Sequence, residues 1–200
     1  MNGAPVVRRV AAFDFDGTIA RRDTLIPFLA RVAGRAPLLA AAARRAPQLV
    51  AMNVGRADRD AEKQHLVRRA LGGHRVADVT EAGVAYADAL WNRQQFRPPM
   101  LDRLAWHATE GHEIVIVSAS LETYLIPLAP RLGVNHVIAC RLETVGDVLT
   151  GELVDGNVRG PEKERRLRAW LGSDPVELWA YGDSSGDDEL LAMADHPTRV

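Results

Sequence analysis

The sequence predicts an α/β fold, a doubly wound parallel sheet with an all-helical cap inserted after its first strand. After residue 98, short apolar runs alternate with longer stretches of helical composition, which is the pattern of strand–helix–strand units. In contrast, residues 24–97 are rich in Ala, Leu, Arg and Glu and contain no convincing strand. We therefore assign residues 1–22 and 98–200 to a core domain and residues 23–97 to a helical cap domain.

The expected elements follow from apolar runs and from the Pro and Gly residues between them. Strands are expected at residues 6–13, 113–117, 136–140 and 176–181. Helices are expected at residues 58–71, 76–95, 100–109, 121–132, 162–171 and 187–194, with shorter helices beginning near Pro27, Pro37 and Pro47. Pro98-Pro99 marks a linker, residues 141–159 a small hairpin, and residues 198–200 the start of one more strand.

The composition is that of an ordinary globular protein. The chain has 200 residues, 47% of them hydrophobic, and a net charge of −1, so we expect no nucleic-acid partner. Its lone cysteine, Cys140, excludes an internal disulfide framework and a multi-thiolate metal site. We see neither a signal peptide nor an uncharged apolar run of the roughly 18–20 residues that span a bilayer. We therefore expect a soluble cytoplasmic protein, of an oligomeric state that the sequence does not indicate.

The first strand ends on two carboxylates in the stretch FDFDGTIARRD. A turn next to Gly17 needs only one acidic residue, yet both Asp14 and Asp16 are present. The second acid therefore indicates chemistry.

Other polar residues also follow strands. Ser118 comes after the apolar run at 113–117, Asp183 comes after LWAYG, and Lys163 opens a helix. Ligands of open parallel sheets bind beyond the carboxyl ends of the strands, so we expect these side chains to meet there.

These residue types together favour phosphoryl transfer. Several acids in one place repel one another unless a cation joins them, and an all-oxygen set of ligands selects Mg²⁺, which usually also binds a phosphate oxygen. A carboxylate can attack phosphorus, Asp16 can move a proton, and Lys163, Ser118 and nearby backbone N–H groups can hold the phosphoryl oxygens. Two simpler alternatives stay open: Ser118 as an N-cap of the next helix, and Arg165 or Arg166 in the place of Lys163.

Four motifs of this chain resemble, in their order and spacing, those of the haloacid dehalogenase-like (HAD) hydrolase superfamily: DFDGT, the strand ending at Ser118, the Lys of GPEK, and YGDSSGDDELL. The resemblance covers essentially the whole chain. The helical insertion resembles subfamily IB, the phosphoserine phosphatase-like group. The resemblance implies a set of roles: Asp14 as nucleophile, Asp16 as general acid/base, Ser118, Ala119 and Lys163 as phosphate ligands, Mg²⁺ held by Asp14, the Asp16 carbonyl and Asp183, and Asp187 in its outer shell. An acid at position 16 favours phosphomonoester hydrolysis through an aspartyl-phosphate. The alternative from another class is a non-catalytic HAD-fold protein that binds a phosphorylated ligand.

The resemblance leaves the substrate open. Asp23 stands where phosphoserine phosphatases carry a Glu that binds the substrate amino group, and the expected carboxylate-binding Arg falls near Val67, beside Arg68. Gly17 replaces a more usual Ser. We therefore expect a different small phosphorylated metabolite or a phospholipid-type head group, with phosphoserine as the alternative.

Residues 24–54 contain arginines and no acid: Arg31, Arg35, Arg44 and Arg45. They are interpreted either as solvated residues of ordinary amphipathic helices or as a basic face that contacts an anionic membrane surface.

Overall fold

The computed structural model describes residues 7–34 and 56–200. Its centre is a six-stranded sheet in the order β4-β3-β2-β1-β5-β6. The strands are β1 (Arg8–Phe13), β2 (Glu113–Leu121), β3 (His136–Val145), β4 (Val148–Val154), β5 (Val176–Gly182) and β6 (His196–Arg199). All neighbours pair in parallel except β3 and β4, which form an antiparallel hairpin. The expected parallel sheet and the expected hairpin are both confirmed.

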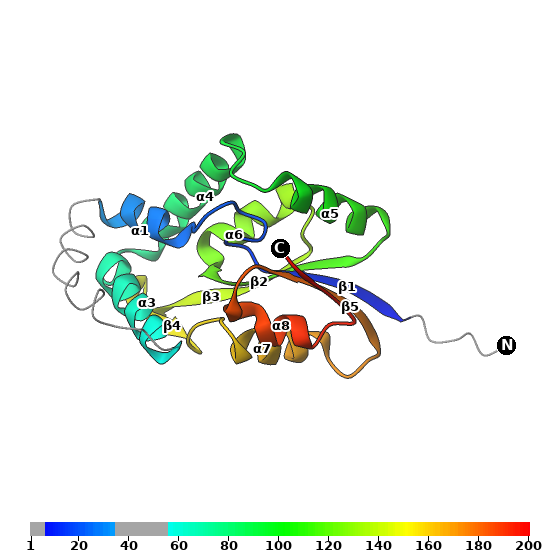
Figure 1. Ribbon diagram of the computed structural model, residues 1–200. Coiled ribbons are helices and arrows are strands. Elements are labelled where there is room, and N and C mark those ends of the chain that lie inside the picture. The colour runs from blue at the N-terminus through cyan, green and yellow to red at the C-terminus, as the bar shows by residue number, and fades with distance from the viewer. Residues whose placement is uncertain (1–6, 35–55) are drawn as a thin grey trace.

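Helices cover both faces of the sheet, as the doubly wound prediction requires (Figure 1). One face carries α5 (Pro98–Thr109) and α6 (Glu122–Leu128), the second of which continues into the 3-10 helix η1 (Ala129–Leu132). The other face carries α7 (Pro161–Leu171), the 3-10 helix η2 (Ser185–Asp187) and α8 (Asp188–Ala192). Parallel strands are normally buried on both faces in this way.

The helices between β1 and α5 lie beyond the carboxyl ends of the strands (Figure 1). They are α1 (Leu25–Ala33), α3 (Arg56–Leu71) and α4 (Val76–Asn92), and we call these three the helical insertion. The turn between α3 and α4 is bonded to β4, because Gly73 N donates to Leu149 O at 2.9 Å and Leu149 N donates to His74 O at 2.9 Å. The insertion is therefore attached to the hairpin as well as to the chain on either side.

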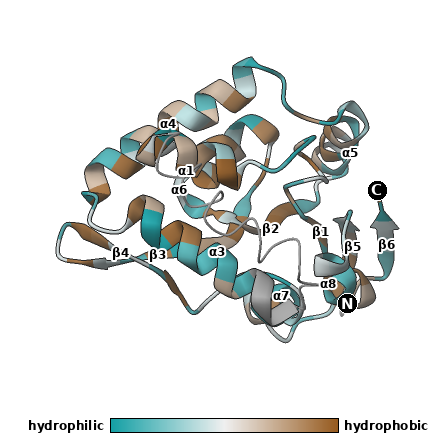
Figure 2. Ribbon diagram, turned by 60° about the vertical axis from the view of Figure 1, so that its left-hand side comes forward, coloured by the Kyte–Doolittle hydropathy of each residue, from teal (hydrophilic) through white to brown (hydrophobic). Residues whose placement is uncertain are grey.

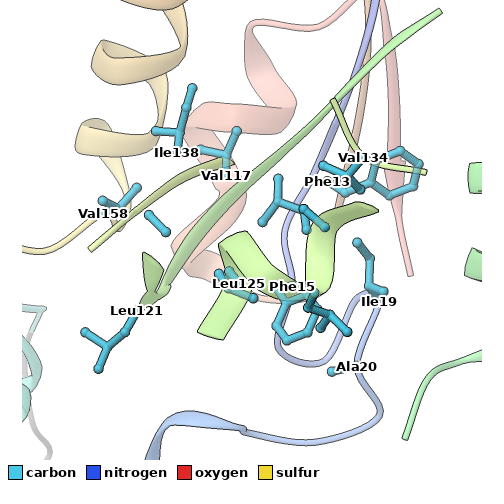
Figure 3. Close-up of a cluster of buried hydrophobic side chains, with 14 of the residues drawn as sticks. Phe13, Phe15, Ile19, Ala20, Val117, Leu121, Leu125, Val134, Ile138 and Val158 are labelled. Atoms are coloured by element: carbon cyan, nitrogen blue, oxygen red, sulfur yellow. The ribbon is translucent and has the colours of Figure 1, made fainter. Parts of the chain in front are cut away.

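One hydrophobic core continues from the sheet into the turn after β1 (Figure 3). Phe15 and Ile19 follow β1 and are fully buried. Leu125 of α6 and Val158, which precedes α7, belong to the same cluster. Along α4 and α3, hydrophobic residues alternate with hydrophilic ones, as expected of helices with one buried face (Figure 2). The burial holds the turn that carries Asp16 in place.

Several element boundaries differ from those expected. Pro98-Pro99 opens α5 instead of forming a linker, because a proline is well tolerated in the first turn of a helix. The expected helix at residues 121–132 is divided, because Pro130 has no N–H to continue the α-helical bonding, and the 3-10 helix η1 begins at Ala129. The helix expected at 187–194 begins as the 3-10 turn η2.

Some expectations fall outside the described residues. These are the helices near Pro37 and Pro47 and the side chains of Arg35, Arg44 and Arg45. Arg31 is described, and it is exposed in the last turn of α1.

In the described parts of the chain, every helix is too short or too polar to cross a membrane.

Candidate active site

The three expected strand ends lie side by side. β1 is hydrogen-bonded to β2 on one side and to β5 on the other, so Asp14 and Asp183 directly follow two neighbouring strands, and Ser118 lies in the last part of a third. The Asp14 N–H donates to Tyr181 O at 2.9 Å and extends the β1–β5 pairing up to the acid. The sheet thus brings together residues that are more than 160 positions apart in sequence.

Lys163, from the first turn of α7, joins two of the acids. Its Nζ lies 2.5 Å from Asp14 Oδ1 and 2.6 Å from Asp187 Oδ1, and all three side chains are almost completely buried. Of the alternatives to Lys163, Arg165 and Arg166 instead pair with Glu162 on the same helix. A buried ammonium placed between two buried carboxylates compensates their charge.

The charges of this cluster are set by burial and by one another. Burial raises the pKa of Asp14 to about 6, although the Lys163 ammonium counteracts that rise. Burial would lower the pKa of Lys163, but the two carboxylates raise it above its usual value and keep the side chain charged. For Asp187, burial opposes Lys163, and the attraction of Lys163 leaves its pKa lowered.

Asp14, Asp183 and Asp187 form the acidic cluster in which a cation could bind. One carboxylate oxygen of each lies within 4.8 Å of the others. The Cβ of any residue larger than glycine at position 17 would lie 2.1 Å from Asp183 Oδ2, so Gly17 leaves the space that this carboxylate occupies. An all-oxygen donor set with this close approach fits Mg²⁺.

Asp187 already has protein partners on both oxygens. Oδ1 accepts from Lys163, and Oδ2 accepts from Ser184 N at 3.0 Å and Ser184 Oγ at 3.1 Å. This arrangement suits an acid that orients its neighbours from the outer shell of a metal.

The Asp16 carboxylate is held by residues that the sequence did not single out. Thr24 donates to Oδ1 from its N–H at 3.0 Å and from its hydroxyl at 2.6 Å, and Ser120 Oγ donates to Oδ2 at 2.5 Å. Tyr124 OH lies 3.1 Å from Thr24 Oγ1. Burial raises the pKa of Asp16 to about 7, against the lowering effect of these hydroxyls. A carboxyl group with this pKa can both give and accept a proton near neutral pH.

Ser118 does not cap a helix. It lies inside β2, which continues to Leu121, and α6 begins only at Glu122. Its Oγ is buried and accepts from Ser120 N at 3.0 Å. The N-cap interpretation was therefore wrong, while Ser118 and the half-buried Ala119 remain at the strand end where phosphate ligands were expected.

The two residues expected to contribute to substrate specificity lie in different places. Asp23 accepts from Ile26 N at 3.0 Å at the start of α1 and lines a cavity of about 280 Å³ with Arg22, Tyr86 and Arg93. Arg68 is exposed, and its Nε donates to Glu152 Oε1 of β4 at 2.5 Å. Arg68 therefore pairs with the hairpin.

Residues 11–192 match the haloacid dehalogenase-like hydrolase family. The chain belongs to this family. This HAD-like hydrolase is 37% identical over 193 residues to the protein CicA of Caulobacter vibrioides. The aligned region covers 93% of this chain and 83% of CicA. It is 30% identical to a probable phosphatase of Mycobacterium tuberculosis, over 98% of this chain and 70% of the relative.

Solved structures show the same HAD fold. A probable phosphoserine phosphatase from Vibrio cholerae superposes with a TM-score of 0.64 at 18% identity, covering 94% of this chain and 54% of that one. At this identity the similarity concerns the fold.

Proposed function

We propose that this HAD-like hydrolase is a Mg²⁺-dependent phosphomonoester hydrolase that acts through an aspartyl-phosphate on Asp14. The observation that carries the proposal is the position of Asp14 at the end of β1, bonded to the buried ammonium of Lys163 and next to Asp183 and Asp187. The phosphatase name of the mycobacterial relative supports the same reaction class.

In the first step, an Asp14 oxygen forms a bond to phosphorus and the bond from phosphorus to the leaving alkoxide breaks. Asp16 gives its proton to that alkoxide. In the second step, Asp16 removes a proton from water, whose oxygen attacks phosphorus and releases phosphate and the Asp14 carboxylate. Lys163, Ser118 and the Ala119 amide hold the phosphoryl oxygens in both steps.

Mg²⁺, held by Asp14, the Asp16 carbonyl and Asp183 with Asp187 behind them, would supply positive charge to the transferring phosphoryl group. We assign residues 23–97 to a cap that recognises the leaving group and the remainder to the catalytic core. The substrate in this proposal is a small phosphorylated metabolite or a phospholipid-type head group. Asp23 would contact its leaving group, because Asp23 lines a cavity together with Thr24, which is hydrogen-bonded to Asp16.

The test is hydrolysis of p-nitrophenyl phosphate and of a panel that includes phosphoserine and phosphorylated head groups, with and without Mg²⁺. The wild-type protein is expected to hydrolyse the chromogenic ester only with the metal. Phosphoserine turnover far above every other metabolite would contradict the substrate proposal alone.

Asp14→Asn and Asp188→Asn form a matched pair for this assay. Asp188 is exposed and paired with Arg199, so its substitution is expected to leave activity unchanged, whereas Asp14→Asn is expected to abolish it. If wild-type protein binds phosphate but hydrolyses no ester in the panel, it is a phospho-ligand-binding protein instead.

A further inference from the structure

A lysine of the helical insertion contacts the segment of β2 that carries the two active-site serines. Lys63, on α3, donates to the carbonyl oxygen of Ala119 and to Asn157 Oδ1, and its Nζ lies 3.1 Å from Cys140 Sγ. Ala119 stands between Ser118 and Ser120. This contact joins the insertion to the core at the site itself.

The contacted segment has little support from the sheet. The pairing of β2 with β1 reaches Ile116, and its pairing with β3 shifts register between Val117 and Leu121. The Ala119 carbonyl accepts instead from Lys63 and, at 3.3 Å, from the Cys140 thiol. At Ala119, side chains thus provide the hydrogen bonds that a neighbouring strand would provide in a regular pair.

The ammonium of Lys63 has a full set of partners. It offers three N–H donors, and Ala119, Asn157 and Cys140 provide three acceptors. Asn157 in turn donates from Nδ2 to Asp60 Oδ1 at 2.6 Å, which fixes the orientation of the amide that Lys63 meets. A donor that is satisfied in this way orients protein groups and is not free to bind a leaving group.

The hairpin holds α3 in the position that makes these contacts. Gln64 Nε2 donates to Gly151 O at 2.9 Å, one residue after Lys63. A Cβ at Gly151 would lie 2.7 Å from Arg68 Cα, so the glycine permits the close approach of α3 to β4. The location of Lys63 is therefore set by the packing of α3 against β4.

We propose that Lys63 is a positioning residue for catalysis, which fixes the Ser118–Ala119–Ser120 segment from the helical insertion. Through Ala119 it orients Ser118 toward the phosphoryl group and Ser120 toward Asp16, whose carboxylate accepts from Ser120 Oγ. This inference rests on the proposed phosphatase reaction and deepens it, because it makes the rate of the chemical step depend on contact between the insertion and the core.

The first test compares kcat and KM for Lys63→Met and Arg69→Met. Arg69 is an exposed cation on the same helix, so its variant controls for the loss of one charge. Because small displacements of catalytic groups are costly, Lys63→Met is expected to lower kcat about 10- to 100-fold. KM should change little, for p-nitrophenyl phosphate and alkyl phosphates alike.

Lys63→Arg keeps a cationic donor and is expected to retain most of kcat. An equal loss of kcat in the Met and Arg variants would overturn the hydrogen-bonding role. If the Lys63→Met variant only raised KM, and only for substrates with charged leaving groups, Lys63 would instead be a substrate-binding residue.

The second test does not depend on activity. Hydrogen exchange of the peptide spanning residues 116–124 is expected to accelerate in Lys63→Met and to stay at the wild-type rate in Arg69→Met, because the Ala119 carbonyl loses its anchor only in the first. Unchanged exchange in Lys63→Met would overturn the proposal. If the wild-type protein hydrolyses no phosphate ester, the proposed function fails while this exchange experiment still decides whether Lys63 fixes the segment.

Discussion

Lys163 Nζ donates to Asp14 Oδ1 across 2.5 Å, although the two residues are 149 positions apart in sequence. The contact joins the first turn of α7 to the end of β1 and places a buried cation on the proposed nucleophile. Asp187 shares that cation, so the site depends on one ammonium to balance two carboxylates.

Replacing Lys163 by Met is expected to destabilise the protein. Breaking a buried ion pair leaves Asp14 and Asp187 close together without a counter-charge, at a cost of about 3–5 kcal/mol. Urea denaturation without Mg²⁺ measures the loss. Arg165→Met, which removes an exposed cation from the same helix, is the control and is expected to change stability little.

Mg²⁺ is expected to restore part of the stability that Lys163→Met loses, because an ion that binds only the folded state stabilises it. A Lys163→Met protein as stable as the wild type in metal-free buffer would contradict the arrangement of charges described above.

If Asp16 donates the proton to the leaving group, the loss of activity in Asp16→Asn is expected to depend on how readily that group leaves. An alkyl phosphate needs a proton on its departing oxygen, so its kcat/KM is expected to fall by about 10²–10⁴. p-Nitrophenolate leaves readily without one, and its loss should be much smaller. Equal losses for both esters would show that Asp16 has another role.

Gly17→Ala and Gly111→Ala separate backbone strain from damage to the acidic cluster. Both glycines have positive φ, +86° and +72°, so each substitution is expected to cost about 1–2 kcal/mol in stability. Only at Gly17 would the new Cβ displace Asp183. A Mg²⁺ titration of activity is therefore expected to require more metal for Gly17→Ala and the wild-type amount for Gly111→Ala. Identical titrations would argue against Asp183 as a ligand.

The burial of His107 is expected to make the protein less stable in weak acid. It is completely buried, its Nε2 lies 2.9 Å from Tyr181 OH, and burial lowers its pKa to about 4. The pKa of His107 is about 6.5 in the unfolded chain and about 4 in the folded protein. The contribution of His107 to the free energy of unfolding is therefore complete above pH 6.5, and it declines as the pH falls from 6.5 to 4, by up to about 1.4 kcal/mol per pH unit.

Urea denaturation at several pH values checks this dependence, with His107→Gln compared with His65→Gln on α3. The His107 variant is expected to show a shallower decline between pH 6.5 and pH 4. A slope equal to that of the wild type would assign the acid sensitivity to other groups.

The parallel sheet and the polar strand ends were predictable because they depend on local pattern. Asp14, Ser118 and Asp183 each directly follow an apolar run, and the carboxyl ends of parallel strands share one edge. The sequence left the N-cap alternative for Ser118 open, since SAS after EIVIV gives no sign that β2 continues to Leu121.

The supporting residues could not be predicted, because they depend on long-range packing. Ser120 reaches Asp16 across 104 positions, and Lys63 reaches Cys140 across 77. Neither pair has a spacing that any local pattern encodes. The ion pair of Arg68 with Glu152 of β4 is likewise a long-range contact that the sequence did not indicate.

The central claim is that Asp14 becomes phosphorylated during turnover. Acid quenching of the enzyme with substrate and Mg²⁺, followed by borohydride reduction and peptide mass spectrometry, converts an aspartyl-phosphate into homoserine at its position. The account predicts homoserine at residue 14, and none when Mg²⁺ or substrate is omitted. An actively hydrolysing enzyme with unmodified Asp14, or with homoserine at another aspartate, would contradict it.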